Sequence, residues 1–140
     1  MRDYLSLLPH TPPMRLLEQV IELVPGERCR ASRTARPDDF YFQGHFPGDP
    51  VVPASILIEL LAQAGGLAAG AASEGHHPVQ LRVAAVGSCK FPSAARSGAL
   101  LEASARVVGH LGPLVKVDGT VTADGVLVAS GGVTLARVEA

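Results

Sequence analysis

The chain has 140 residues, of which 47% are hydrophobic and 18% are charged, and its formal net charge is −1. This composition indicates one packed domain over residues 1–140, and the near-zero charge gives no electrostatic reason to expect nucleic acid or an anionic membrane as a partner. The two cysteines, Cys29 and Cys89, lie far apart without metal-ligand spacing. We interpret them as free thiols of a cytoplasmic protein.

Prolines divide the first part of the chain into short elements. Residues 3–8 are expected to form a helical turn that ends at Pro9, because proline cannot continue a helix. Residues 15–24 have the β-branched content of a strand. Together with the turn residues Pro25-Gly26 and a strand-like run over residues 28–34, they favour a β-hairpin.

A loop rich in proline and glycine, residues 43–52, leads into the longest apolar run of the chain. The run is rich in leucine and alanine and predicts a helix from Pro53 to Ala72, with proline accepted at the first helical position. Its length alone would allow a membrane-spanning helix. Glu59 would then lie near the bilayer centre at a cost of a few kcal/mol, so we expect a helix buried inside the domain and no membrane span.

The remainder of the chain alternates apolar and polar residues with the period of two that is typical of strands. The four expected strands cover residues 79–91, 99–108, 114–123 and 126–138. Asp124-Gly125 predicts a tight hairpin between the last two. One long helix followed by several antiparallel strands predicts an α+β fold in which the sheet wraps around the helix.

Two polar side chains interrupt the apolar helix: Glu59 and, on the same helical face, Gln63. Burial among leucine and isoleucine side chains is expected to raise the pKa of Glu59, because desolvation disfavours the charged form. In the preceding loop, His45 can titrate near neutral pH. A histidine base and a glutamic acid fit proton removal next to a carbonyl coupled to loss of a hydroxyl. Free backbone N–H groups near Ala54 and Ser55 can stabilise the charge that develops on the carbonyl.

Each of these side chains also has a purely structural explanation. A histidine in a proline-rich loop is more often a hydrogen-bonding partner than a base, and a single buried glutamate is often a structural polar contact. Spacing alone does not bring His45 and Glu59 together. His76 and His77 could bind a metal, but no third ligand is evident and a solvated loop is favoured. His10 is expected to pack near the adjacent proline.

The segment GHFPGDPVVPASILIELLAQ, residues 44–63, closely resembles the active-site segment of the bacterial (3R)-hydroxyacyl-[acyl-carrier-protein] dehydratases of FabZ type. Residues 7–20 resemble the N-terminal segment of that family, and residues 89–92 (CKFP) correspond to a strand that enters its binding tunnel. The resemblance covers most of the chain. It implies a hot-dog fold, a homodimer or a trimer of such dimers, and no metal or redox cofactor. The implied substrate is carried on the phosphopantetheine arm of acyl carrier protein.

The resemblance also implies roles for individual residues. In the family each dimer has two active sites, and each site uses both chains. His45 of one chain would remove the C2 proton of a 3-hydroxyacyl thioester, and Glu59 of the other would protonate the departing hydroxyl to leave a trans-2-enoyl thioester. Gln63 would support Glu59, and a backbone carbonyl near Val51 would orient the imidazole. The substrate-binding positions that the resemblance indicates are Phe46, Pro53, Lys90 and Phe91. A docking patch for the acidic carrier protein is one interpretation of Arg82, Lys90 and Arg96, and scattered surface charge is the other.

One departure from the family pattern is informative; the N-terminal segment also differs, at residues 12–14 and at Glu18. The family has glycine after the third proline of the motif, and its N–H polarises the thioester carbonyl, whereas this chain has Ala54. Alanine keeps the N–H, but its methyl group can crowd the thioester or shift the loop. The departure leaves room for a specialised paralogue and for two alternatives, a hot-dog acyl thioesterase and a catalytically impaired, dehydratase-like binding subunit. The intact motif around His45 argues against the thioesterase.

Overall fold

The computed structural model describes residues 4–44, 48–71 and 81–137. Six antiparallel strands form one sheet in the order β1-β2-β4-β5-β6-β3. The strands are β1 (Gln19–Val24), β2 (Arg28–Thr34), β3 (Leu81–Val86), β4 (Leu100–Leu111), β5 (Leu114–Ala123) and β6 (Val126–Arg137). The described helices are α1 (Ala54–Gly70) and the 3-10 turns η1 (Tyr4–Leu7) and η2 (Phe40–Phe42).

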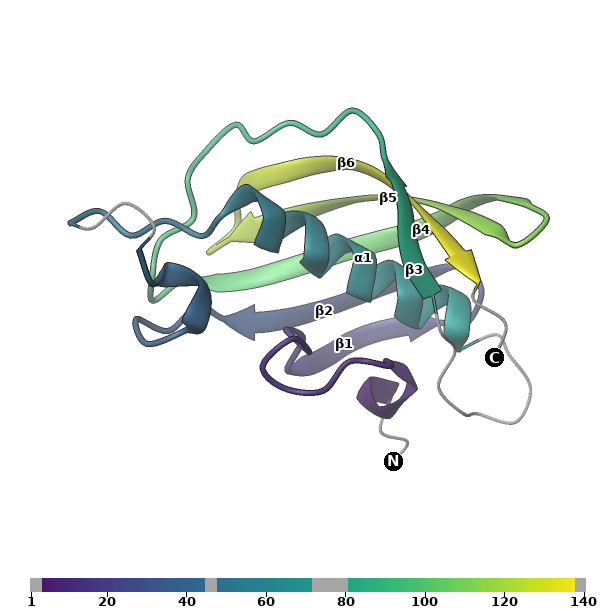
Figure 1. Cartoon of the computed structure of the whole chain (residues 1–140), viewed down its shortest axis with the longest axis horizontal. Helices are drawn as coiled ribbons and strands as arrows, with labels where there is room; N and C mark the ends of the chain where they lie inside the picture. The colour runs from purple at the N-terminus through teal and green to yellow at the C-terminus, as the bar shows by residue number, and fades with distance from the viewer. Residues whose placement is uncertain (1–3, 45–47, 72–80, 138–140) are drawn as a thin grey trace.

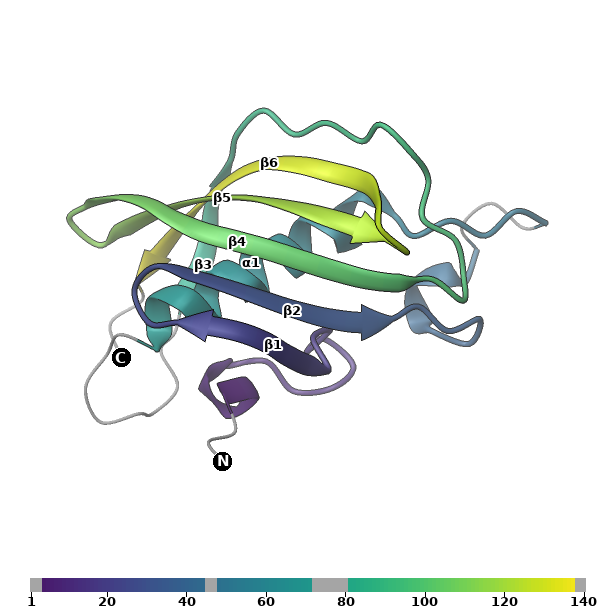
Figure 2. The same cartoon turned by 180° about the vertical axis from the view of Figure 1, so that it is seen from behind.

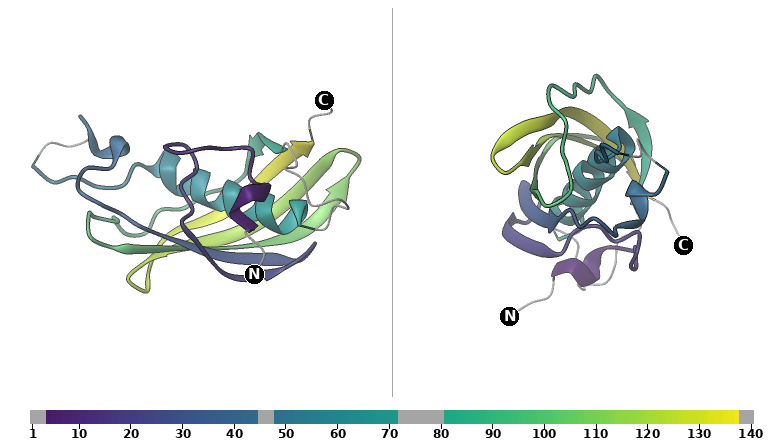
Figure 3. Two further views of the ribbon diagram at one scale, coloured as in Figure 1. Left: turned by 90° about the horizontal axis from the view of Figure 1, so that it is seen from below. Right: turned by 90° about the vertical axis from the view of Figure 1, so that its left-hand side faces the viewer.

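The helix α1 lies along one face of the sheet, as Figure 1 shows, and the strands cover it in the reverse view of Figure 2. Seen end-on in Figure 3, the strands curve around the helix, while the N-terminal segment with η1 runs along its open side. The prediction of an α+β hot-dog fold, with an antiparallel sheet wrapped around one central helix, is therefore confirmed.

The core lies between α1 and the inner face of the sheet. Because strand side chains alternate between two faces, every second residue of β4 and β5 points at the helix. These inward positions are buried and carry small or branched side chains: Leu101, Ala103, Ala105, Val115, Val117 and Val121. On the helix, Gly65 allows close approach to β5, because a Cβ atom there would lie 2.7 Å from Cγ1 of Val117. A side chain larger than hydrogen at this position would force Val117 to shift.

The element boundaries differ from the predicted ones in several places. The strand predicted over residues 79–91 ends at Val86, because after it the chain forms only an isolated bridge with β6, at Lys90. Pro53 precedes the helix as its N-cap residue instead of occupying the first helical position, and α1 ends at Gly70. The first strand begins at Gln19, and the N–H groups of Leu16 and Leu17 before it are bonded to the side chain of Gln63 instead of to a neighbouring strand. The strand predicted over residues 99–108 continues to Leu111, so that the following turn is shorter than expected.

The hairpin between β5 and β6 forms where the sequence predicts it. Asp124 has φ 48° and Gly125 has φ 83°, and positive values at both central residues are characteristic of the tight turn that suits the twist of paired strands. Asp124 also accepts a hydrogen bond from the N–H of Leu100 through Oδ1, at 2.9 Å. The turn residue therefore ties the end of the hairpin to the start of β4.

The strand β3 forms one end of the sheet and pairs with β6 on one side. It is the least covered of the strands: residues 82–86 are all exposed, and Val83 and Val86 are 44% and 48% exposed. Beyond β3 the chain stays beside β6, where Lys90 forms an isolated bridge with Ser130. No helix within the described ranges is long and apolar enough to cross a membrane.

Candidate active site

Glu59 lies in the second turn of α1, on the side of the helix that the sheet does not cover. Its side chain is 22% exposed and borders a cavity of about 280 Å³. The cavity is bounded by residues 7–10 at the end of η1, by helix positions 59, 62, 63 and 66, by residues 81–83 of β3 and by Leu135 of β6. Glu59 is the only carboxylate among the described residues that line this cavity. It therefore lies between the N-terminal segment and β3.

The surroundings of Glu59 favour its protonated form. Burial raises the pKa of the carboxyl group, while a hydrogen bond with the Gln63 side chain lowers it, and the net shift is upward. Desolvation acts in this direction because the charged form loses more solvation energy than the neutral form. The predicted upward shift in the pKa of Glu59 is thus confirmed, and the group is suited to donate a proton.

His10 faces Glu59 across the cavity. Its Nε2 atom lies 3.8 Å from Oε1 of Glu59. Burial lowers the pKa of His10, which favours the neutral imidazole. The sequence predicted only packing near Pro9, because nothing in the spacing relates His10 to a helix residue far along the chain.

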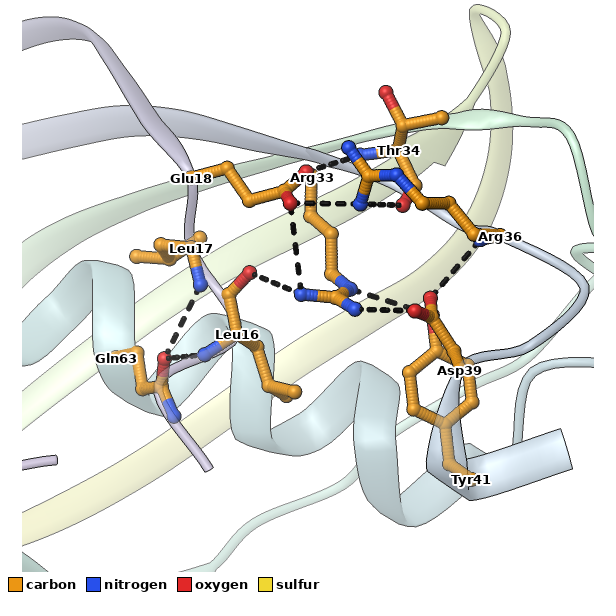
Figure 4. Close-up of polar contacts among 9 residues, drawn as sticks. All are labelled: Leu16, Leu17, Glu18, Arg33, Thr34, Arg36, Asp39, Tyr41 and Gln63. Atoms are coloured by element: carbon orange, nitrogen blue, oxygen red, sulfur yellow. Dashed lines mark hydrogen bonds and ion pairs between the residues drawn. The ribbon is translucent and has the colours of Figure 1, made fainter. Parts of the chain in front are cut away.

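Gln63, four residues after Glu59, is 1% exposed and ties the N-terminal segment to the helix. Its Oε1 accepts hydrogen bonds from the N–H groups of Leu16 (2.9 Å) and Leu17 (3.4 Å). Its Nε2 donates to the carbonyl of Met14 at 2.7 Å. The amide therefore holds three backbone groups, in addition to its effect on the Glu59 carboxyl; Figure 4 shows the bonds to Leu16 and Leu17.

A second polar cluster fixes the same segment from the other side, as Figure 4 shows. Arg33 of β2 donates to the carbonyl of Leu16 at 3.1 Å and to Oδ1 of Asp39 at 2.7 Å. The hydroxyl of Tyr41 donates to Oδ2 of Asp39 at 2.6 Å. The cluster joins the N-terminal segment to η2, which leads directly into the histidine-containing loop.

The charges of this cluster shape its pKa values. Burial raises the pKa of Asp39, but the hydrogen bonds from Tyr41, the Arg36 backbone and Arg33 outweigh burial and lower it overall. Burial and the hydrogen bond to Asp39 raise the pKa of Tyr41 to about 12. At neutral pH the cluster thus contains an ionised Asp39 and a neutral Tyr41 that donates to it.

The start of α1 is docked on the segment before β4. The N–H of Val52 donates to the carbonyl of Ala95 at 2.7 Å. The neighbouring Val51 forms a bridge with Arg96, and Nε of Arg96 donates to Oδ1 of Asp49 at 3.0 Å. One of the three residues of the predicted docking patch therefore pairs with a carboxylate of the loop itself.

Ala54 is the first residue of α1 and is exposed. Its φ is not positive, so the backbone conformation does not require the glycine that the family has at this position. The N–H groups of the first helical turn have no acceptor within the helix. Those of Ala54 and Ser55 are thus available to an acceptor that approaches the helix start.

The structure describes only some of the other residues that the sequence singled out. His45 and Phe46 lie outside the described residues, as do His76 and His77. Lys90 and Phe91 are exposed and do not line the Glu59 cavity, whereas Arg82 does. The described part of the chain contains no group of three or more His, Cys, Asp or Glu side chains placed to hold a metal ion.

The two glycines that flank the histidine segment both have a left-handed backbone. Gly44 has φ 72° and Gly48 has φ 95°. These values are readily adopted only by glycine. The predicted shaped loop therefore has its two turning points at these residues.

A larger cavity of about 840 Å³ lies over β2, β4, β5 and β6. Its charged lining residues are Glu22, Arg28, Arg30, Arg106 and Asp118. Glu59 and His10 are not among the residues that line it.

Residues 8–131 match the FabA-like domain. The chain belongs to the FabA-like family. Among the curated proteins that are similar to this FabA-like chain, the 3-hydroxyacyl-[acyl-carrier-protein] dehydratase FabZ of Nitratidesulfovibrio vulgaris (strain DP4) is 35% identical over 136 residues, which cover 96% of this chain and 88% of the relative. The protein of the same name from Myxococcus xanthus is 35% identical over 131 residues, covering 92% of this chain and 85% of the relative. The family inferred from the motif is therefore confirmed.

Solved structures share the fold of the FabA-like chain at low sequence identity. The dehydratase heterocomplex ApeI:P from Xenorhabdus doucetiae contains a chain with a TM-score of 0.84 and 19% identity, covering 99% of this chain and 93% of that one. A hypothetical thioesterase from Streptococcus pneumoniae, solved with coenzyme A, has a TM-score of 0.67 and 12% identity, with 86% and 84% covered. These likenesses concern the fold and do not separate the two activities.

Proposed function

We propose that this protein dehydrates (3R)-3-hydroxyacyl thioesters of acyl carrier protein to trans-2-enoyl thioesters, in the biosynthesis of fatty acids or related acyl chains. The observation that carries the proposal is the half-buried Glu59, whose pKa is raised at the edge of a cavity. A FabA-like family membership and curated relatives named as 3-hydroxyacyl-[acyl-carrier-protein] dehydratases support the same activity.

In the proposed reaction His45 acts as base and Glu59 as acid. His45 accepts the C2 proton, and the electrons of the C2–H bond form the C2–C3 double bond. The C3–O bond breaks with its electron pair, and the proton of Glu59 converts the departing hydroxyl to water. His45 then holds one proton and Glu59 lacks one, so a proton transfer between them or through solvent restores the starting state. Each group is expected to contribute a factor of about 10² to 10⁴ in rate.

The helix start supplies the electrophilic part of the proposed site. As the C2 proton leaves, negative charge develops on the thioester carbonyl oxygen. The N–H of Ala54 is available to donate to that oxygen, and the dipole of α1 favours negative charge at the same end. In this proposal the carbonyl of Val51 orients the His45 imidazole, and Gln63 supports Glu59 by holding the adjacent backbone.

We place the complete site between two copies of the chain. The uncovered β3 presents exposed valines and an unpaired edge within the described sheet, and such edges are covered in stable proteins. Residues 81–83 of β3 also border the Glu59 cavity. In the proposed dimer a second chain packs on β3, closes the cavity and contributes its own His45 to the site of Glu59. The minimal unit is a homodimer, and a trimer of dimers is compatible with it.

The carrier protein is proposed to approach the surface near β3 that remains exposed in the dimer. Arg82 and Lys90 are exposed there and offer positive charge to an acidic partner. Phe46, Pro53 and Phe91 are the proposed contacts of the acyl chain and its pantetheine arm. Cys29 and Cys89 are free thiols, which fits work in the reducing cytoplasm.

The deciding experiment mixes the purified protein with a 3-hydroxyacyl thioester of acyl carrier protein and follows enoyl formation and free thiol together. Enoyl product without free thiol is the expected result. Free thiol without enoyl would identify a thioesterase, and neither product would identify a binding subunit. His45→Ala and Glu59→Gln should each lower the rate at least about a hundredfold.

Shared sites can be tested with the same two variants. If each site uses His45 of one chain and Glu59 of the other, a mixed dimer of His45→Ala and Glu59→Gln chains retains one intact site. Activity should therefore reappear when the two inactive variants exchange subunits. Mixing two samples of the same variant is the matched control and should restore nothing.

A further inference from the structure

His10 reaches Glu59 because the N-terminal segment runs along the open side of α1. The distance of 3.8 Å between Nε2 of His10 and Oε1 of Glu59 exceeds that of a hydrogen bond. The two side chains are 27% and 22% exposed, so neither is fully enclosed by the protein. Catalytic hydrogen bonds are often long without substrate and shorten in the substrate complex.

The two ring nitrogens of His10 have different surroundings. Nδ1 is buried without a hydrogen-bond partner among the described residues, whereas Nε2 faces the carboxyl group of Glu59. Burial also lowers the pKa of the ring, which favours a neutral imidazole with a single N–H. Buried N–H groups without an acceptor are rarer in proteins than buried acceptors without a donor. The proton is therefore assigned to Nε2, where Glu59 can accept it.

We propose that His10 is a positioning residue for the acid Glu59, with its Nε2–H donating to Oε1 so that the acidic proton is held on Oε2. The oxygen that carries the proton is then the one left for the substrate hydroxyl. When Glu59 has given up this proton, the same N–H stabilises the carboxylate that remains. His10 acts through Glu59 and does not contact the reacting atoms. This inference rests on the proposed dehydratase function.

The other described side chains that line the cavity are less suited than His10 to donate to Oε1 of Glu59. Gln63 acts on the same carboxyl, but its oxygen and one donor position are occupied by the backbone of residues 14–17. Arg82 is the remaining charged residue among the described residues that line the cavity, and it is exposed on β3. The rest of the described lining is apolar side chains, proline and glycine. Besides the second N–H of Gln63, the donor that faces Glu59 among the described residues is therefore Nε2 of His10, at 3.8 Å.

The test compares three substitutions that differ in where they place a donor. A glutamine amide nitrogen reaches roughly the position of Nε2, an asparagine amide reaches that of Nδ1, and phenylalanine keeps the ring shape without a donor. His10→Gln should retain most of kcat, whereas His10→Asn and His10→Phe should lower kcat about tenfold. KM should change little in all three, because the donor acts on the acid and not on substrate binding.

The pH profile supplies a readout that a packing role would not move. The loss of activity at high pH, which reports deprotonation of the acid, should shift to higher pH in His10→Asn and His10→Phe because the carboxylate has lost a donor. In a Glu59→Gln background, His10→Asn should cause no further loss, since residues that act as a unit are not additive. Equal kcat for His10→Gln and His10→Asn, a loss confined to KM, or an unmoved profile would each overturn the proposal.

An activity-independent measurement separates this proposal from the dehydratase function. The pKa of the Glu59 carboxyl can be followed by carbon-13 NMR of the folded protein, and it should rise in His10→Asn relative to His10→Gln. If the wild-type protein has no dehydratase activity, the proposed function is refuted. The difference in the Glu59 pKa between the two variants would still show whether His10 donates to Glu59. A normal wild-type reaction with unchanged pKa in both variants would refute the role of His10 alone. Circular dichroism of each variant establishes that the folded state is compared.

Discussion

The side-chain oxygen of Gln63 accepts a hydrogen bond from the backbone N–H of Leu16 at 2.9 Å. This bond lies one helical turn beyond Glu59, in a site where Gln63 is 1% exposed. Together with the bonds to Leu17 and Met14, it fastens the N-terminal segment to the helix that carries the acid. The position of His10 opposite Glu59 therefore depends on a glutamine that touches neither ring nitrogen.

Gln63→Met should destabilise the fold, because methionine has similar length but cannot bond to the backbone. Two N–H groups and one carbonyl would lose their buried partner, and we expect a loss of about 3 kcal/mol in the free energy of unfolding. Denaturant unfolding at fixed protein concentration measures it. Gln19→Met, an exposed glutamine on β1, is the matched control and should change stability by less than about 0.5 kcal/mol. Equal effects of the two substitutions would contradict the proposed anchoring.

Glu59→Gln should lower activity and yet raise stability at alkaline pH. The folded-state pKa of Glu59 is raised by burial, so the folded protein keeps this proton to higher pH than the unfolded chain. As pH rises from the unfolded value of about 4.3 through the folded pKa, the wild type therefore loses stability that the glutamine variant does not lose. The difference in unfolding free energy should be near zero at pH 4 and favour the variant at pH 8. A variant less stable than wild type at pH 8 would show that the ionised carboxyl is paired in the folded state.

The local part of this site could be predicted from the sequence. Glu59 and Gln63 share a helical face because they are four residues apart, and the apolar run predicts burial and the direction of the Glu59 pKa shift. The motif also led to the fold and the family, both of which are confirmed. In contrast, the roles of His45, Ala54 and Lys90 in the reaction remain predictions.

The non-local part of the site could not be predicted. The approach of His10 to Glu59 and the pairing of Arg96 with Asp49 join segments that are remote in sequence. Such pairings depend on how the N-terminal segment and the loop before β4 fold back on the helix. Neither hydrophobic periodicity nor turn residues in the sequence predict them. The start of β1 was misplaced for the same reason, since a helix side chain takes the backbone groups of residues 14–17.

Asp39→Asn should destabilise the protein at neutral pH, and the effect should fade in acid. Asp39 has a lowered pKa because hydrogen bonds from Tyr41, Arg36 and Arg33 outweigh its burial. Its ionised form thus contributes stability above the unfolded pKa of about 3.9, and this contribution is lost as pH falls through the folded pKa. We expect a loss of about 2 kcal/mol at pH 7.

The comparison should be made by denaturant unfolding from pH 7 to pH 2.5. The wild type and Asp39→Asn should converge as the pH falls, because the aspartate of the wild type becomes neutral. Asp38→Asn changes an adjacent aspartate outside this cluster and provides the control. A difference in unfolding free energy between wild type and Asp39→Asn that stays constant with pH would mean that packing of the side chain, and not its charge, explains the effect.

Substitutions of Ala54 can separate its N–H from its methyl group. Ala54→Gly removes the methyl and keeps the N–H, and should raise kcat/KM several-fold if the methyl crowds the thioester, as the family pattern suggests. Ala54→Pro removes the N–H from a position where helices accept proline. The preceding Pro53 has φ −58° and ψ 144°, the extended conformation that a following proline requires.

The proline variant should therefore fold with little change in its melting temperature while its kcat falls about a hundredfold, the typical cost of one donor to a developing oxyanion. Steady-state kinetics with a 3-hydroxyacyl thioester and thermal unfolding of the same samples provide both measurements. Activity in Ala54→Pro close to that of wild type would exclude this N–H as the donor. An unchanged or lower kcat/KM in Ala54→Gly would show that the methyl group is accommodated, so that the departure from glycine does not limit the reaction.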